Sequence, residues 1–258
     1  MVEFAKPRPG LSKEECYFYH VCNVPGVGIV GDQWDLRENV DYYLGNIEYS
    51  GKTVLDVGTA TGYLTFEMEK RGAAIVSFDM SSSEQYAFVP FYNDPMSRGQ
   101  LIEEWGVALE RVKNGYWFCH QHFESSAKVY YGDVYDLPED LGQFDLVFVG
   151  MCLPHFRDPC KALTSITRRS LDLVVITQPY FSDPRPILRL APEVDTGDFT
   201  FARFLWWTMS DTFLIEFMKI LGFSLSKIET SVHTCVAYDP PRKVDVGAFV
   251  FKGRSGSC

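Results

Sequence analysis

The sequence predicts a single α/β domain built around a mostly parallel β-sheet, and three observations support this fold class. The chain has 258 residues, of which 46% are hydrophobic, so it can bury one full core. From Thr53 onward, short β-branched runs alternate with helical stretches, as in successive βαβ units. The runs DLVFVG and DLVVIT are apolar on both faces, which is typical of strands covered by helices on both sides.

Along the chain, the pattern predicts a lead-in or lid (residues 1–50), the sheet domain (51–252) and a frayed tail (253–258). Glycines and a proline in NVPGVGIVGDQW exclude a long element from the lead-in, and a short helix is expected from Leu36 to Leu44. The expected strands are TVLDV, IVSFD, KVYYGDV, DLVFVG, DLVVIT and VGAFVFKG. A late helix is expected from Asp211 to Leu221, because a serine precedes it and a glycine follows it.

Charge and cysteine content restrict the possible functions. The formal charge of -10 argues against an extended nucleic-acid-binding surface, because such a surface needs many Lys and Arg side chains to neutralise the phosphates. The seven cysteines form no C-x-x-C pair, so neither a disulfide framework nor a zinc site is indicated. The chain has no apolar run typical of a signal peptide or a membrane span, and we expect a cytoplasmic protein.

The segment VLDVGTATGYLTF places a turn of small residues between the first strand of the sheet and a helix. Such a turn lets a ligand approach the backbone, and the helix start offers unpaired N–H groups. The dinucleotide fingerprint G-x-G-x-x-G would need glycine where the sequence has Ala60 and Tyr63. NAD is therefore disfavoured as the ligand.

The same segment resembles motif I of the class I S-adenosylmethionine (SAM) dependent methyltransferases, acidic-x-G-x-x-x-G. Three further matches follow in order: Asp79 at the end of IVSFD, Asp133 in VYYGDVYDLP, and the motif IV segment FDLVFVGMCLPHFRDPCKAL. The resemblance implies SAM as cofactor and a Rossmann-like fold with a seven-stranded sheet whose last strand is antiparallel. It implies cofactor-binding roles for Asp56, Gly58, Thr59, Gly62, Asp79, Met80, Asp133, Val134, Gly150 and Met151.

A looser resemblance links QWDLRENVDYYLGNIEYSGKTVLDVG and MCLPHFRDP to the group related to the tRNA wobble-uridine carboxymethyl-transferring enzymes. It adds Trp34 and Arg37 as cofactor-binding candidates. In that tRNA family, a longer N-terminal region and basic residues help to bind a carboxylated SAM and the tRNA. Here the lead-in is short and the chain acidic, so tRNA is not the preferred substrate.

Methyl transfer depends mainly on alignment, and a base is needed only for a weakly acidic acceptor. The candidates for a catalytic base are His155, after the fourth strand, and His20, in the lead-in; a packing role is the alternative for both. His120 and His122 would point to different faces of a helix, so no metal site is expected. The aromatic cluster FARFLWWTMS is consistent either with a wall for an apolar acceptor or with core packing.

The segment between Asp79 and Asp133 is longer than one helix needs. A helix containing Val112 and His120 is expected to flank the sheet, which leaves Tyr86 to Trp105 as a flap over the substrate or as a packing insertion. The preferred function is methyl transfer to a small-molecule acceptor. Two alternatives stay open: a nucleic-acid methyltransferase, which predicts a basic surface, and a SAM-binding protein without catalysis.

Overall fold

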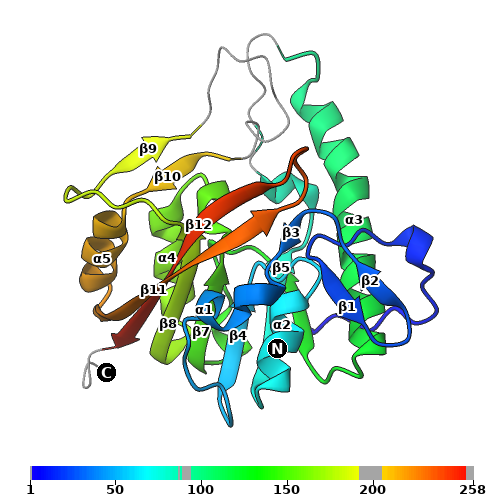
Figure 1. Ribbon diagram of the computed structural model, residues 1–258, viewed down its shortest axis with the longest axis horizontal. Coiled ribbons are helices and arrows are strands. Elements are labelled where there is room, and N and C mark those ends of the chain that lie inside the picture. The colour runs from blue at the N-terminus through cyan, green and yellow to red at the C-terminus, as the bar shows by residue number, and fades with distance from the viewer. Residues whose placement is uncertain (1, 87, 89–93, 192–204, 254–258) are drawn as a thin grey trace.

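The computed structural model describes residues 2–86, 88, 94–191 and 205–253, which form a central sheet with helices on both faces (Figure 1). The strands of the sheet, in spatial order, are β3 (Trp34–Asp35), β11 (Phe223–Cys235), β12 (Arg242–Gly253), β8 (Ser170–Pro179), β7 (Phe144–Gly150), β4 (Thr53–Val57), β5 (Ala74–Met80) and β6 (Lys128–Gly132).

The five strands from β8 to β6 run parallel, and β12 is antiparallel to both β8 and β11. This arrangement confirms the predicted methyltransferase-type fold with an antiparallel last strand. The described residues add an eighth strand, because two residues of the lead-in, β3, pair with β11 at the edge of the sheet. The six strands expected from the sequence are β4, β5, β6, β7, β8 and β12.

Alternate residues of the central strands supply two hydrophobic cores. Val54 and Leu146 belong to the cluster beneath α2 (Tyr63–Lys70), α3 (Arg98–His122) and the lead-in. Their neighbours Leu55 and Val147 belong to the cluster beneath α4 (Pro159–Thr167) and α5 (Asp211–Ile220). Because successive side chains of a strand point to opposite faces, a strand covered on both sides must be apolar throughout.

The late helix forms as expected: Ser210 accepts a hydrogen bond from the Phe213 N–H, and α5 ends at Ile220. The helix expected at Leu36 to Leu44 is shorter, consisting of the 3₁₀ turn η2 (Arg37–Asn39) and α1 (Val40–Tyr43). The insertion also differs from the expectation. Its helix α3 begins at Arg98, within the segment expected to be a flap, after a capping box between Ser97 and Gln100.

The remaining elements are short. The lead-in holds the 3₁₀ turn η1 (Lys13–Glu15) and a hairpin of β1 (Cys22–Val24) and β2 (Gly28–Val30). A two-stranded sheet of β9 (Leu188–Leu190) and β10 (Trp207–Met209) lies apart from the central sheet. Further 3₁₀ turns are η3 (Ser83–Tyr86), η4 (Glu139–Leu141) and η5 (Leu153–His155). Among the described helices, none has the length and apolar character to cross a membrane.

The lead-in is attached at both edges of the central sheet. Near its start, the Ala5 N–H donates to the Val129 carbonyl on the edge strand β6, at an N–O distance of 2.8 Å. Near its end, β3 pairs with β11 at the opposite edge. Between these points the Tyr17 N–H donates to the Arg111 carbonyl of α3 at 2.9 Å. A Cβ at Gly115 would lie 2.2 Å from the Tyr17 carbonyl oxygen, so only glycine permits this approach.

Candidate active site

The turn after β4 is held in a conformation that depends on glycine. Gly58 and Gly62 have φ angles of 79° and 81°, a region that costs little only for glycine. The N–H groups of Gly58 and Thr59 donate to the Phe78 carbonyl at 2.9 and 3.1 Å, which fixes the turn to β5. A Cβ at Gly58 would lie 3.0 Å from the Cβ of Cys152, so the turn packs closely against the loop after β7.

Asp56 lies beneath this turn and is 1% exposed. Its Oδ2 accepts a hydrogen bond of 2.6 Å from Thr65 Oγ1, which also lies 2.9 Å from Thr59 Oγ1. Burial raises the pKa of the Asp56 carboxyl to about 6, against the effect of its threonine partners. Asp56 therefore holds the turn and the start of α2 together from below.

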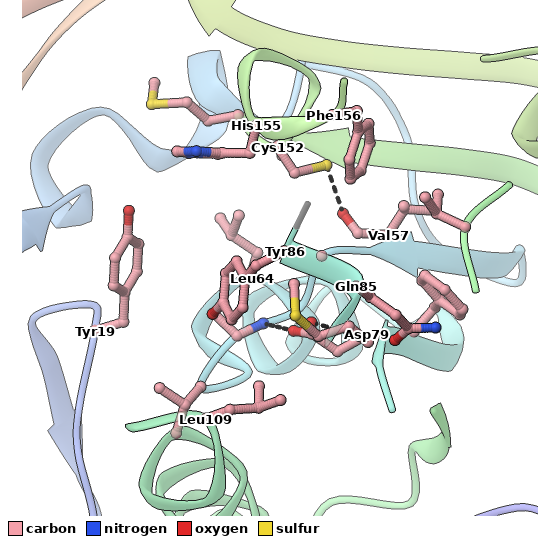
Figure 2. Close-up of a pocket in the computed structure, with 18 of the residues that line it drawn as sticks. Tyr19, Val57, Leu64, Asp79, Gln85, Tyr86, Leu109, Cys152, His155 and Phe156 are labelled. Atoms are coloured by element: carbon pink, nitrogen blue, oxygen red, sulfur yellow. Dashed lines mark hydrogen bonds between the residues drawn. The ribbon is translucent and has the colours of Figure 1, made fainter. Parts of the chain in front are cut away.

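Asp79, at the end of β5, faces the other side of the turn (Figure 2). Its Oδ2 accepts the Ala60 N–H and its Oδ1 accepts the Met80 N–H, both at 2.8 Å. Burial raises the pKa of this carboxyl above its usual value, against the effect of these two hydrogen bonds. Each oxygen has a second lone pair, so the carboxylate can accept two further hydrogen bonds from a diol.

A cavity of about 460 Å³ opens above the carboxyl ends of β4, β5, β6 and β7, a size typical of a small-molecule site. Ten of the fourteen residues predicted for the site line it: His20, Trp34, Gly58, Asp79, Met80, Asp133, Val134, Gly150, Met151 and His155. Asp133 is exposed, and its Oδ1 accepts the Tyr135 N–H at 2.9 Å. The structure thus brings together the ends of four neighbouring strands, where parallel sheets bind ligands.

Four predicted residues do not line the cavity: Arg37, Asp56, Thr59 and Gly62. Arg37 belongs to the exposed ion pair with Asp35. Its Nε and Nη2 donate to the two carboxylate oxygens of Asp35 at 2.8 and 2.7 Å, so the guanidinium is held on the surface beside β3. Thr59 and Gly62 are buried in the turn, and a Cβ on Gly62 would collide with the rings of Phe66 and Tyr116.

The two histidines that line the cavity differ in environment. His155 lies in η5, directly after the loop that follows β7. His20 is 8% exposed, its Nδ1 has no hydrogen-bond partner, and burial lowers its pKa to about 3. His20 is therefore uncharged at neutral pH. His120 binds the Ala127 carbonyl through Nε2 at 3.0 Å, and His122 packs on Phe118, so neither reaches the cavity.

Several lining residues were not singled out from the sequence. Tyr17, Tyr19, Gln33 and Tyr43 come from the lead-in, and Leu109 comes from α3. The sequence YFYH places tyrosine at alternate positions, which could have indicated an extended segment with both tyrosines on one side. In the structure Tyr17 and Tyr19 are half-buried, and Phe18 and His20 are buried. The insertion contributes Tyr86 and Trp105, at the two ends of the expected flap.

The aromatic cluster FARFLWWTMS does not form a wall of this cavity where it is described. Trp207 donates through Nε1 to the Arg157 carbonyl at 3.1 Å, and the Arg157 guanidinium lies over the Trp206 ring. Neither tryptophan lines the cavity. Phe201 and Phe204 lie outside the described residues. Within the described part of the chain, no group of three or more His, Cys, Asp or Glu side chains is arranged to hold a metal ion.

Comparison with known proteins agrees with this geometry. A family model described as a methyltransferase domain matches residues 33–225, which is most of the chain. Among solved structures, the N-terminal domain of EvdMO1, studied with S-adenosylhomocysteine (SAH) and D-fucose, is 16% identical, with 94% of each chain covered and a TM-score of 0.54.

Two other solved structures have the same fold. Magnesium protoporphyrin IX methyltransferase from Synechocystis PCC 6803, with bound SAH, is 11% identical over 85% of this chain and 82% of that chain, with a TM-score of 0.52. A protein from Pyrococcus horikoshii described as a candidate RNA methyltransferase is 16% identical over 83% of this chain and 79% of that chain, with a TM-score of 0.51. The chain belongs to the methyltransferase-domain family and is a class I SAM-dependent methyltransferase.

Proposed function

We propose that this protein transfers a methyl group from SAM to a small-molecule acceptor, with the cavity above β4 to β7 holding both molecules. The observation that carries the proposal is the pairing of the glycine turn at Gly58 with the carboxylate of Asp79 at the carboxyl ends of β4 and β5. A side chain at position 58 would fill space against Cys152, and Asp79 keeps free lone pairs toward the cavity. Both features fit an adenosyl ligand lying on the sheet edge.

We assign the adenosine half of SAM to the β5 and β6 side of the cavity. Asp79 would accept the two ribose hydroxyls through charge-assisted hydrogen bonds. Asp133 and Val134, directly after β6, would contact the adenine ring. Gly58, Gly150 and Met151 would lie against the sulfur end, at the ends of β4 and β7. Bound SAM supplies an electrophilic methyl group, and the protein supplies alignment of the acceptor with it.

Of the two candidate bases, His155 is the better one for an acceptor that must lose a proton. It lines the cavity close to Met151 and Cys152, at the end of β7. Burial keeps the pKa of His20 near 3, so His20 is a weak base and is better suited to a hydrogen bond with a bound molecule.

A small-molecule acceptor is supported over nucleic acid by the state of two basic residues that flank β8, Arg169 before the strand and Arg185 after it. Arg169 is buried and donates to the Glu139 carbonyl at 3.1 Å. Arg185 pairs through Nε and Nη2 with the carboxylate of Asp183. Both guanidinium groups therefore already have protein partners, and the chain as a whole carries a charge of -10, which disfavours phosphate binding. The cytoplasmic location stays a prediction.

Mass spectrometry of the purified protein under native conditions, followed by calorimetric titration with SAM and SAH, tests cofactor binding. A labelled-methyl assay over fractions of a cell extract then tests transfer. We expect both nucleosides to bind and label to reach a low-molecular-mass fraction. Label found only in the RNA fraction would favour the nucleic-acid alternative, and binding without any transfer would contradict catalysis.

A further inference from the structure

The cavity has two walls of aromatic side chains in addition to the proposed donor site at Asp79 and Asp133. The first wall comes from the lead-in and contains Tyr17, Tyr19, Trp34 and Tyr43. The second wall comes from the insertion and contains Tyr86 and Trp105. In Figure 2, Tyr19 and Asp79 lie on opposite sides of the drawn pocket, with Tyr86 between them. Tyr19 of the lead-in wall therefore lies across the pocket from Asp79.

Both walls are fixed by contacts outside the cavity. Tyr86 is stacked on Phe88, with ring centroids 5.2 Å apart, and lies 5.5 Å from the Trp105 ring. The insertion is tied to α3 by Ser83 Oγ, which donates to the Ile102 carbonyl at 2.7 Å. These contacts give the insertion wall a shape that does not depend on a ligand, and a preformed flat aromatic surface favours a flat partner.

The lead-in wall is held in a similar way. The Trp34 N–H donates to the Tyr19 carbonyl at 3.2 Å, and the Val21 N–H donates to the Trp34 carbonyl at 2.7 Å. The backbone of Tyr17 is fixed to α3 by its hydrogen bond with Arg111. The rings of this wall are therefore presented by paired backbone and not by a free loop.

Few charged groups of the described residues lie around these walls. Within that part of the chain, the Asp, Glu, Lys and Arg side chains that line the cavity are Asp79, Asp133 and Arg111. The two carboxylates lie on the proposed adenosine side, and Arg111 Nη2 donates to the Cys16 carbonyl at 3.2 Å. His20, which also lines the cavity, is uncharged. Arg111 is therefore the one cation among the described lining residues, and its guanidinium is directed to the lead-in backbone, so a buried anionic acceptor would depend on Arg111 alone for a protein counter-charge.

We propose that the acceptor is an uncharged molecule with a flat aromatic ring, held between the lead-in wall and the insertion wall, with His20 as a polar neighbour. This inference rests on the proposed methyltransferase function and narrows its substrate class. A cationic acceptor, which aromatic rings also attract, would be repelled by the sulfonium of bound SAM.

The test uses the full chain saturated with SAH and three matched probes in calorimetric titrations at pH 7. The probes are 2-naphthol, the anion 2-naphthoate, and the saturated alcohol decahydro-2-naphthol. We expect 2-naphthol to bind at least about tenfold more tightly than 2-naphthoate, because Arg111, which is directed to the Glu14 and Cys16 carbonyls, would not offset the desolvation of the anion. We expect the saturated alcohol to bind roughly fivefold more weakly than 2-naphthol, because it cannot stack.

Variants at one wall position provide the matched control. Tyr19→Leu removes the ring and should lower the affinity for 2-naphthol by about fivefold. Tyr19→Phe keeps the ring and should retain most of that affinity. Trp105→Leu tests the insertion wall in the same way, and thermal melting confirms that each variant is folded. For each of the two leucine variants, the loss for 2-naphthol should exceed the loss for SAH.

The outcomes separate this inference from the proposed function. Equal binding of 2-naphthol and 2-naphthoate, equal binding of the saturated alcohol, or no binding of any probe to the SAH-saturated protein would overturn the inference. Equal affinities of Tyr19→Leu and Tyr19→Phe for 2-naphthol would also overturn it. If SAH itself fails to bind the folded protein, the proposed function, in which this cavity holds SAM and a small-molecule acceptor, fails instead.

Discussion

The Asp79→Asn substitution tests the proposed donor site most directly. In the structure each carboxylate oxygen of Asp79 already accepts one backbone N–H at 2.8 Å, which leaves one lone pair per oxygen for the two ribose hydroxyls of SAM. Asparagine keeps one acceptor oxygen but loses the charge and the second acceptor. Since a hydrogen bond to a charged group contributes about 1.5–3 kcal/mol, we expect a loss of about 2–3 kcal/mol in SAH binding. This loss corresponds to roughly a 30- to 150-fold rise in Kd.

Isothermal titration with SAH measures this loss, and a second ligand identifies its source. With the analogue of SAH that lacks the ribose 2′-hydroxyl, the Asp79→Asn penalty should shrink to about half, because one of the two affected hydrogen bonds is absent. Asp136→Asn is the matched control, since Asp136 is exposed and does not line the cavity. It should leave Kd unchanged.

Folding should be affected less than binding by Asp79→Asn. Burial raises the pKa of Asp79, so the negative charge itself does not stabilise the native state. Asparagine cannot accept both backbone N–H groups, so we expect the free energy of unfolding to fall by about 1–2 kcal/mol. An unchanged Kd for SAH would contradict the assignment of Asp79. An equal penalty for both ligands would mean that the substitution acts through the turn at Ala60 and not through the ribose.

Three further predictions concern the frame of the site. Gly115→Ala should lower the free energy of unfolding in urea by about 1–3 kcal/mol, because the added Cβ would collide with the Tyr17 carbonyl oxygen. Gly99→Ala in the same helix has no such contact and should raise the free energy of unfolding by up to about 1 kcal/mol. Equal effects of the two substitutions would refute the contact. Between about pH 4 and 6 the native state keeps a proton on Asp56 that the unfolded chain has released, so the contribution of Asp56 to stability falls as pH rises. From pH 4 to pH 7, the free energy of unfolding of Asp56→Asn should therefore rise relative to that of the wild type by up to about 3 kcal/mol. A difference between the two proteins that does not change with pH would contradict the raised pKa. Arg37→Ala should change the Kd for SAH by less than about twofold, since one exposed ion pair contributes little; a tenfold loss would restore the cofactor role expected from the sequence.

The parallel core of the sheet could be predicted because strands buried on both faces are apolar throughout, as β7 and β8 are. The strand β11 was not among the expected runs. Its sequence, FSLSKIETSVHTC, contains many polar residues at exposed or half-buried positions, and it lies second from the edge of the sheet. The helix α3 was expected to be shorter because the capping box at Ser97 lies within the segment assigned to a flap.

For the candidate site, the residues at strand ends could be predicted from their order along the chain. Asp79 and Asp133 follow neighbouring parallel strands, so their positions at one edge follow from the topology. The aromatic walls could not be predicted in this way. Tyr17 and Tyr19 reach the cavity only because the lead-in packs against α3 at Gly115, a contact between segments far apart in the sequence.

The attachment of the lead-in at both edges of the sheet has a consequence for the entry and release of ligands. A segment fixed at Ala5 on one edge and at β3 on the other can bow outward, but it cannot swing aside like a door with a single hinge. Molecules that reach the cavity from the lead-in side must therefore pass a segment that is held at both ends. A compact metabolite can pass such a segment, whereas a polymer approaching from that side would have to be threaded past it or present a loose end.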